Sequence, residues 1–146
     1  MFILGIQIHC HPDNSIFLSQ RAYLEDVLLC LGQSGICTVL TPLIPNQQLV
    51  AAPADHVPDT AFRCRYMQAV GLLMYAMFGT CPDLAYVVGV LGCHTAGPNN
   101  AYWSAVVRIC RYLKGTLNYS IEYTLDAPPF PDVAGACRSD HCPQHP

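Results

Sequence analysis

The sequence predicts an α+β fold in which an N-terminal β-hairpin precedes a mainly helical bundle and a C-terminal strand with a frayed tail. Two short apolar runs near the start flank a cluster of turn-forming residues, which is typical of a hairpin. Longer apolar segments follow in the second half, and Pro or Gly marks their ends, as is typical of helices. The residues from 126 onward are rich in Pro, so we expect them to be frayed.

The first apolar run, residues 2–8, is expected to form a buried strand, and residues 16–18 are expected to be its hairpin partner. Between them, residues 11–15 include Pro, Asp, Asn and Ser, which are residues that favour turns. The two runs therefore predict an antiparallel pair at the start of the chain.

A first helix is expected over residues 20–31. Ser19 stands where an N-cap belongs, and Gly32 supplies the stop. Apolar residues recur at helical spacing on one face of this segment, while charged and amide residues occupy the other. From residue 33 to about residue 61, four prolines with several Asn and Asp residues indicate an extended connector over the surface.

Three more helices are expected, at residues 63–78, 82–93 and 99–114. A Pro stands at the start of the second and of the third, where its missing N–H costs nothing, and a Gly follows the third. Residues 118–124 then alternate as a strand. The chain thus divides into a hairpin with one helix, an extended connector, a helical region and a tail expected to be disordered, at residues 1–40, 41–62, 63–125 and 126–146.

The composition limits the class of protein. Hydrophobic residues make up 52% of the chain and charged residues only 12%, whereas soluble domains carry about 25% charged residues. No apolar run approaches the roughly 20 residues of a membrane-spanning helix, so we expect no membrane contact. The apolar excess instead favours a piece of a larger assembly with bare contact surfaces. Nine cysteines without a secretory signal predict reduced thiols and an intracellular setting, in the cytoplasm or nucleus.

Several short motifs occur in an order that is specific as a set, although none is decisive alone. They are Leu4-Gly5-Ile6 in the first strand, Thr41-Pro42-Leu43 in the connector, Leu73-Met74-Tyr75, Gly79-Thr80 and Pro82-Asp83-Leu84 in the helical region, and Arg111-Tyr112-Leu113-Lys114-Gly115 in the last helix. This set resembles the copia-type LTR retrotransposon polyprotein, in the C-terminal part of its reverse transcriptase. The resemblance runs from residue 2 to about residue 125.

The resemblance implies a place for each part of the chain. Residues 1–40 would contain the end of the palm and a thumb helix, residues 63–125 the connection, and residues 126–146 a degenerate entry to the ribonuclease H domain. The chain departs from the family at Cys81, where Arg is usual, and at Phe130, where the first metal-binding Asp of that nuclease stands. The resemblance therefore implies a fragment of an RNA-directed DNA polymerase.

Polymerase chemistry needs clustered carboxylates that hold two metal ions. In the family, Mg²⁺ is held by an upstream Asp and by a Tyr-x-Asp-Asp hairpin, and this sequence contains no Asp-Asp pair. Its only adjacent acidic pair, Glu25-Asp26, falls on the polar face of the first helix, where a solvated pair is expected rather than a metal site. We therefore expect no catalytic residue, metal or cofactor in this chain, and no activity of the chain alone.

Two sets of residues are candidate nucleic-acid contacts. Leu4, Gly5 and Ile6 resemble the strand that grips the primer end in reverse transcriptases, although a simple buried hairpin strand explains their apolar character equally well. The resemblance implies that the partners of the intact enzyme are an RNA–DNA or DNA duplex and the remainder of the polymerase.

The second set lies on the last predicted helix. Arg108, Arg111 and Lys114 recur at helical spacing and are candidates for phosphate contact, as in the thumb and connection helices of the family. An ordinary solvated face, with Lys114 well placed for the helix dipole, explains them equally well. The net charge of −3 adds no overall basic field that would favour the first interpretation.

Two other functions remain open from the sequence. The apolar helical hairpin at residues 66–93 could be the docking surface of a non-catalytic interaction module, which predicts self-association or a stable partner. A small zinc-binding protein is the third hypothesis, because Cys and His cluster near the C-terminus, but their Cys-x3-His-Cys-x2-His spacing fits no closed zinc site well. The residues concerned are Cys137, His141, Cys142 and His145.

Overall fold

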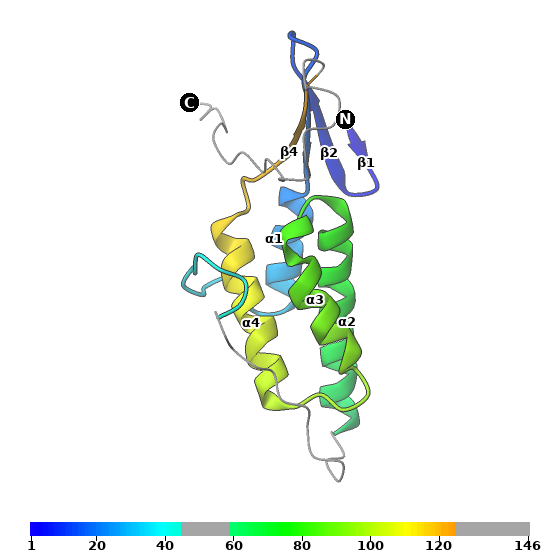
Figure 1. Ribbon diagram of the computed structural model, residues 1–146, viewed down its shortest axis with the longest axis vertical. Helices are drawn as coiled ribbons and strands as arrows, with labels where there is room; N and C mark the ends of the chain where they lie inside the picture. Colours follow the sequence, from blue (N-terminus) through cyan, green and yellow to red (C-terminus); the bar gives the residue numbers. More distant parts are fainter. Residues whose placement is uncertain (45–58, 125–146) are drawn as a thin grey trace.

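A computed structural model of the chain describes residues 1–44 and 59–124. In this part of the chain, a small antiparallel sheet projects from one end of a bundle of helices, as Figure 1 shows. The predicted α+β class is confirmed. The elements in chain order are β1 (Phe2–Ile3), β2 (Ile6–Cys10), β3 (Ile16–Ser19), α1 (Arg21–Cys30), α2 (Thr60–Gly79), the 3₁₀ helix η1 (Pro82–Leu84), α3 (Ala85–Cys93), α4 (Asn100–Gly115) and β4 (Ile121–Tyr123).

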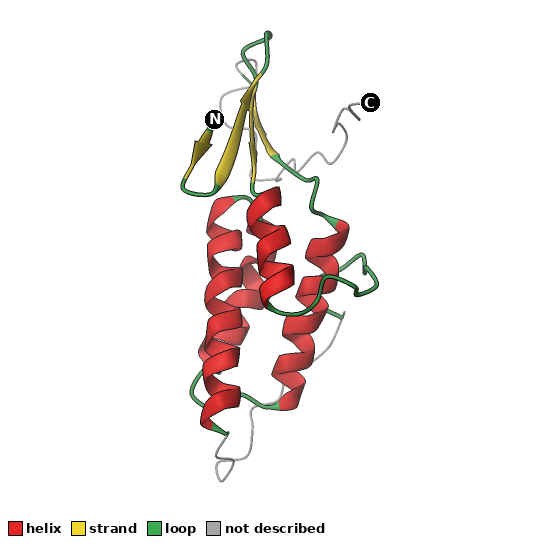
Figure 2. Cartoon of the chain, turned by 180° about the vertical axis from the view of Figure 1, so that it is seen from behind, coloured by secondary structure: helices red, strands yellow, loops and turns green. Residues whose placement is uncertain are grey.

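The sheet combines the two ends of the described chain. Its strand order is β1-β2-β3-β4, and each neighbouring pair is antiparallel. Ile8 lies opposite Leu18, and Leu18 lies opposite Ile121, so the predicted C-terminal strand returns to the N-terminal hairpin. Figure 2 shows the strands in yellow at one end of the red helices. Because β3 precedes α1 and β4 follows α4, the pairing of these two strands holds the start of α1 near the end of α4.

The prediction of one buried strand over residues 2–8 is wrong. A tight turn at Leu4 and Gly5 splits the run into β1 and β2, with φ angles of 50° and 76°. Positive φ at both central residues is the requirement of the type I′ hairpin turn, and Gly5 meets it without strain. The expected burial is also wrong, because Phe2, Ile3 and Leu4 are exposed.

The start of α1 differs by a residue from the prediction. Ser19 is the last residue of β3, and Gln20 occupies the N-cap position. The Ser19 hydroxyl nevertheless accepts a hydrogen bond from the backbone N–H of Arg21, at 3.3 Å. The prediction of Ser19 as the N-cap is therefore wrong. Its hydroxyl still provides a partner for an N–H that has none within the helix.

The other helix boundaries shift in similar ways. α2 begins at Thr60, three residues before the predicted start, with Asp59 as its N-cap. The segment predicted as one helix at residues 82–93 opens with the 3₁₀ turn η1 and continues as α3. Asn99 is the N-cap of α4, and its side chain accepts a hydrogen bond from the backbone N–H of Tyr102 at 3.1 Å. The expectations for residues 45–58 and 125–146 lie outside the described residues.

In the described part of the chain, the buried core lies between the helices and contains no residue of the sheet. Its buried side chains are Leu24, Val27, Leu28 and Leu31 with Tyr66, Ala69, Val70, Leu73, Ala76, Leu84, Val87, Val88, Leu91, Tyr102, Ala105, Val106, Ile109, Cys110 and Leu113. Tyr66 is fully buried, and its hydroxyl donates a hydrogen bond to the carbonyl of Leu91 at 2.9 Å. Because a buried hydroxyl without a partner is destabilising, this bond fixes α2 against α3.

A polar contact joins the start of α1 to the end of α2. Gln20 is 1% exposed, and its Oε1 accepts a hydrogen bond from the Thr80 hydroxyl at 3.0 Å. The Gln20 amide lies directly against the backbone of Gly79, where a Cβ would come within 2.2 Å of Gln20 Oε1. Gly79, the last residue of α2, is therefore required here for its lack of a side chain.

Candidate nucleic-acid interface

The helix α4 carries the densest positive charge of the described chain. Its inner face is apolar and buried, and its outer face carries Arg108, Arg111 and Lys114 at spacings of three residues. No acidic residue occurs in this helix. The three cations predicted on the last helix therefore do lie on one helix, α4.

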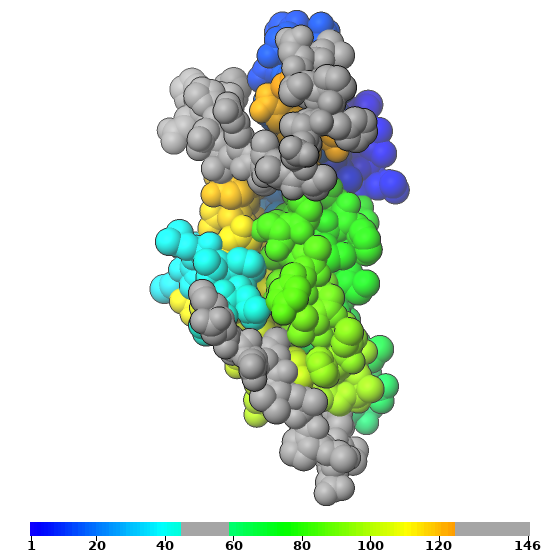
Figure 3. All heavy atoms as spheres, in the orientation of Figure 1, coloured from blue at the N-terminus to red at the C-terminus, as the bar shows by residue number. Residues whose placement is uncertain are grey.

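The three cations of α4 hold the segment that follows α1. Arg108 Nη2 donates a hydrogen bond to Thr41 Oγ1, and Arg111 Nε donates one to the carbonyl of Cys37, both at 2.9 Å. Lys114 Nζ donates to the carbonyl of Ile36, also at 2.9 Å. Figures 1 and 3 show this segment in cyan, lying over the yellow helix α4. All three side chains are half-buried by the contact.

These contacts orient the cations without neutralising them, because each acceptor is a carbonyl or a hydroxyl. Within residues 1–44 and 59–124, the one salt bridge is between Arg21 and Glu25, on α1. The outer face of α4 therefore keeps its three positive charges. A row of cations on a rigid helix is an arrangement that attracts the phosphates of a nucleic-acid backbone.

An aromatic cluster lies next to this row, where α2 and α4 meet. The guanidinium of Arg65 lies over the Trp103 ring, 4.6 Å from its centroid, and the Phe62 ring lies 6.0 Å away. Such a cation–π contact adds roughly 0.5–1 kcal/mol at an exposed site. Arg65 of α2 thus adds a fourth cation, close to Trp103. The sequence analysis missed this residue, because the spacing of residues along α4 carries no information about a neighbouring helix.

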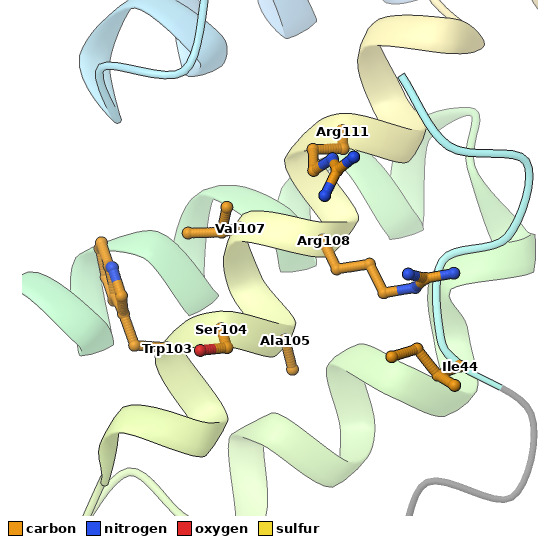
Figure 4. A pocket seen from close by; sticks show the side chains of 7 residues that line it. All are labelled: Ile44, Trp103, Ser104, Ala105, Val107, Arg108 and Arg111. Carbon is orange, nitrogen blue, oxygen red and sulfur yellow. The ribbon is translucent and has the colours of Figure 1, made fainter. Parts of the chain in front are cut away.

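A hollow of about 310 Å³ lies between Trp103 and the two arginines of α4. Figure 4 shows it, lined by Ile44, Trp103, Ser104, Ala105, Val107, Arg108 and Arg111. Arg108 Nε is buried and has no hydrogen-bond partner among the described residues. The hollow thus combines an aromatic wall with cationic groups, which suits contact with a stretch of nucleic-acid backbone better than an enclosed small-molecule site.

The other candidate set lies elsewhere. Leu4 and Gly5 form the turn between β1 and β2, and Ile6 begins β2. The Tyr75 hydroxyl of α2 donates a hydrogen bond to the carbonyl of Leu4, which fixes the turn against that helix. In Figures 1 and 2, β1 and α4 lie on opposite sides of the molecule. The structure therefore does not bring the two predicted sets together.

The acidic pair Glu25-Asp26 lies on the solvent-exposed face of α1. The Glu25 carboxylate pairs with Arg21 at 2.9 Å, at the helical spacing of four residues, and both side chains are about half exposed. Over the described ranges, no three His, Cys, Asp or Glu side chains gather closely enough to hold a metal ion. Cys137, His141, Cys142 and His145 lie outside those ranges.

No helix in the described part of the chain is long and apolar enough to cross a membrane.

The chain is similar to polyproteins of plant transposons. It is 36% identical over 118 residues to the retrovirus-related Pol polyprotein from transposon TNT 1-94 of Nicotiana tabacum, a match that covers 78% of this chain and 9% of the polyprotein. It is 33% identical over 120 residues to the polyprotein from transposon RE2 of Arabidopsis thaliana, covering 82% of this chain and 8% of that one. The chain thus spans less than a tenth of either polyprotein.

A much shorter relative contains the same segment. The uncharacterized mitochondrial protein AtMg00810 of Arabidopsis thaliana is 32% identical over 120 residues, and the match covers 82% of this chain and 48% of the relative. No protein-family model and no solved structure matches the chain. These relatives support a segment of a retrotransposon polyprotein.

Proposed function

We propose that the chain is the C-terminal part of a copia-type reverse transcriptase, from the end of the palm through the thumb and connection to the entry of the ribonuclease H domain. In this proposal it holds a primer–template duplex, either RNA–DNA or DNA, against a palm that the rest of the polymerase supplies. The ordered motifs of residues 2–125 and the similarity to two plant Pol polyproteins support this interpretation.

The observation that carries the proposal is the outer face of α4. Arg108, Arg111 and Lys114 are held by neutral acceptors, so their charges remain available to phosphates. Hydrogen bonds to the Thr41 hydroxyl and to two backbone carbonyls fix the direction of these side chains before any duplex arrives, which lowers the entropy lost on binding. The expected contact is with the sugar–phosphate backbone and is independent of base sequence.

Catalysis is assigned to residues outside this chain. Two-metal polymerisation needs carboxylates from at least two elements around a shared pair of ions. In the proposal, Mg²⁺ is bound by the upstream Asp and the Tyr-x-Asp-Asp hairpin of the intact enzyme. The present chain then acts as a scaffold that is inactive alone.

The proposal predicts salt-dependent binding of an RNA–DNA hybrid. Fluorescence anisotropy with a labelled hybrid should show affinity that falls as salt rises. The triple variant Arg108→Gln, Arg111→Gln and Lys114→Gln keeps N–H donors for the interaction with residues 36–41 but removes three charges. For every phosphate that is no longer neutralised, the slope of log affinity against log salt should fall by about 0.9, up to a total of about 2.7.

Arg21→Gln is the control, because the charge that it removes is already paired with the Glu25 carboxylate on α1. It should leave the salt slope nearly unchanged, and far-UV circular dichroism should show that all variants keep their helices. The absence of hybrid binding at low salt would remove the nucleic-acid role. So would an equally large decrease of binding in Arg21→Gln, which would mean that only the overall charge matters.

A further inference from the structure

The outward side of α2 is unusually apolar for a helix that meets solvent. We define the α2 outer face by Cys64, Met67, Gly71, Met74, Tyr75 and Phe78, which recur at spacings of three and four residues and are all exposed. Met67 is 47% exposed, Met74 41% and Phe78 77%. In Figure 2, α2 runs along the margin of the bundle, and no other described helix lies on its outer side.

Charge is missing from this face over most of its length. The fifteen residues from Tyr66 to Thr80 contain no Asp, Glu, Lys or Arg. A helix on the surface of a soluble domain normally presents charged residues to water, whereas here Gln68 is the one long polar side chain of the stretch. Contiguous exposed apolar surface of this kind marks a contact site.

Gly71 stands at the middle of the α2 outer face. Among the described residues, a Cβ placed there would meet nothing within 4 Å, so no packing in that part of the chain requires a glycine. In an exposed helix interior, a glycine costs about 1 kcal/mol relative to Ala. A glycine does, however, let a second helix approach the backbone closely, since it adds no side chain at the crossing point.

We propose that a second copy of this chain docks on the α2 outer face, with its own α2 antiparallel and crossing at Gly71. Cys64 and Phe78 each lie seven residues from Gly71, on either side of it. In the antiparallel pair, Cys64 of one copy would therefore lie level with Phe78 of the other. Such a two-fold contact is self-complementary, because the same surface serves both copies.

Charge favours the antiparallel arrangement. Arg63 would lie level with the C-terminal end of the partner helix, where the helix dipole is negative. The two Arg63 side chains of the pair would be separated by more than about 20 Å along the helix axis, at 1.5 Å per residue, so they would not repel one another. A parallel pair would instead place the two cations side by side.

The relatives favour a second copy over the rest of a polyprotein as the occupant. The homologous segment forms only 9% and 8% of the two Pol polyproteins but 48% of the mitochondrial relative. The segment therefore occurs in a chain that has far less additional sequence with which to cover this face. A second copy is available wherever the segment is made, and the proposal does not depend on nucleic-acid binding.

Sedimentation velocity of the full 146-residue chain under reducing conditions tests the proposal. A concentration series should show a reversible monomer–dimer equilibrium. Phe78→Glu should raise the dissociation constant by at least about tenfold, as expected when an exposed aromatic at an interface is replaced by a charge. Tyr86→Glu is the matched control: Tyr86 is 74% exposed on α3, outside the α2 outer face, and its replacement should leave the equilibrium unchanged.

Gly71→Leu provides a second, independent variant, because it adds bulk at the crossing point and favours the helix itself. It should weaken the dimer while circular dichroism shows an intact helical fold. A chain that stays monomeric over the whole series would overturn the proposal. A dimer that neither Phe78→Glu nor Gly71→Leu weakens, or one that Tyr86→Glu weakens equally, would also overturn it, since the α2 outer face would then not be the specific interface.

Discussion

Gly79→Ala is expected to lower the free energy of unfolding by about 3 kcal/mol, because it adds a methyl group to a fully packed site and breaks a buried hydrogen bond. The new Cβ would lie 2.2 Å from Gln20 Oε1 and 2.3 Å from the Gln20 amide carbon and nitrogen. Gln20 is 1% exposed, so its side chain would have to move within the buried interior. Moving it would separate Oε1 from the Thr80 hydroxyl and break this buried hydrogen bond.

Urea denaturation followed by circular dichroism measures this destabilisation. Gly89→Ala is the matched control, because a Cβ at Gly89, inside α3, would meet no atom of residues 1–44 or 59–124 within 4 Å. Since Ala favours a helix over Gly, that variant should gain about 0.5–1 kcal/mol. A Gly79→Ala protein as stable as Gly89→Ala would show that the packing between the start of α1 and the end of α2 does not constrain the fold.

The helices could be predicted from the sequence because their signals are local. Apolar periodicity, Gly32 after α1 and Pro82 at the start of η1 each depend on residues within one or two turns. The split between β1 and β2 could not be predicted in the same way. The turn contains Leu4, with φ of 50°, where Asn or Gly would be usual, so the run has no polar residue that signals a turn.

The candidate site shows the same division. The sequence predicted one helix for Arg108, Arg111 and Lys114, and all three lie on α4. Their hydrogen bonds with the segment after α1 join residues 67 to 78 positions apart, and no local pattern encodes pairs at that separation. The part of the site that could be predicted is thus the part carried by a single helix, while the acceptors that orient the cations depend on tertiary packing.

Alkaline pH is expected to destabilise the fold through Cys110, a fully buried residue of α4. Burial raises the pKa of the Cys110 thiol from 9.0 to about 11, because the thiolate would lose its hydration. Below pH 9 the thiol is protonated in both the folded and the unfolded chain, and its contribution to stability is fully present. Between pH 9 and pH 11 the unfolded chain releases this proton while the folded chain keeps it, so stability falls by up to about 1.4 kcal/mol per pH unit.

The total destabilisation assigned to Cys110 is therefore about 3 kcal/mol above pH 11. Burial also raises the pKa of Tyr66, which adds an effect of the same sign at higher pH. Urea denaturation below pH 9 and above pH 11, with a reductant present, should show a smaller pH effect in Cys110→Ala than in the unchanged chain. Cys93→Ala is the control, because Cys93 is exposed and meets water in both states. If Cys110→Ala keeps the full pH effect, the alkaline destabilisation comes from other groups, and Cys110 is not buried from solvent as the structure has it.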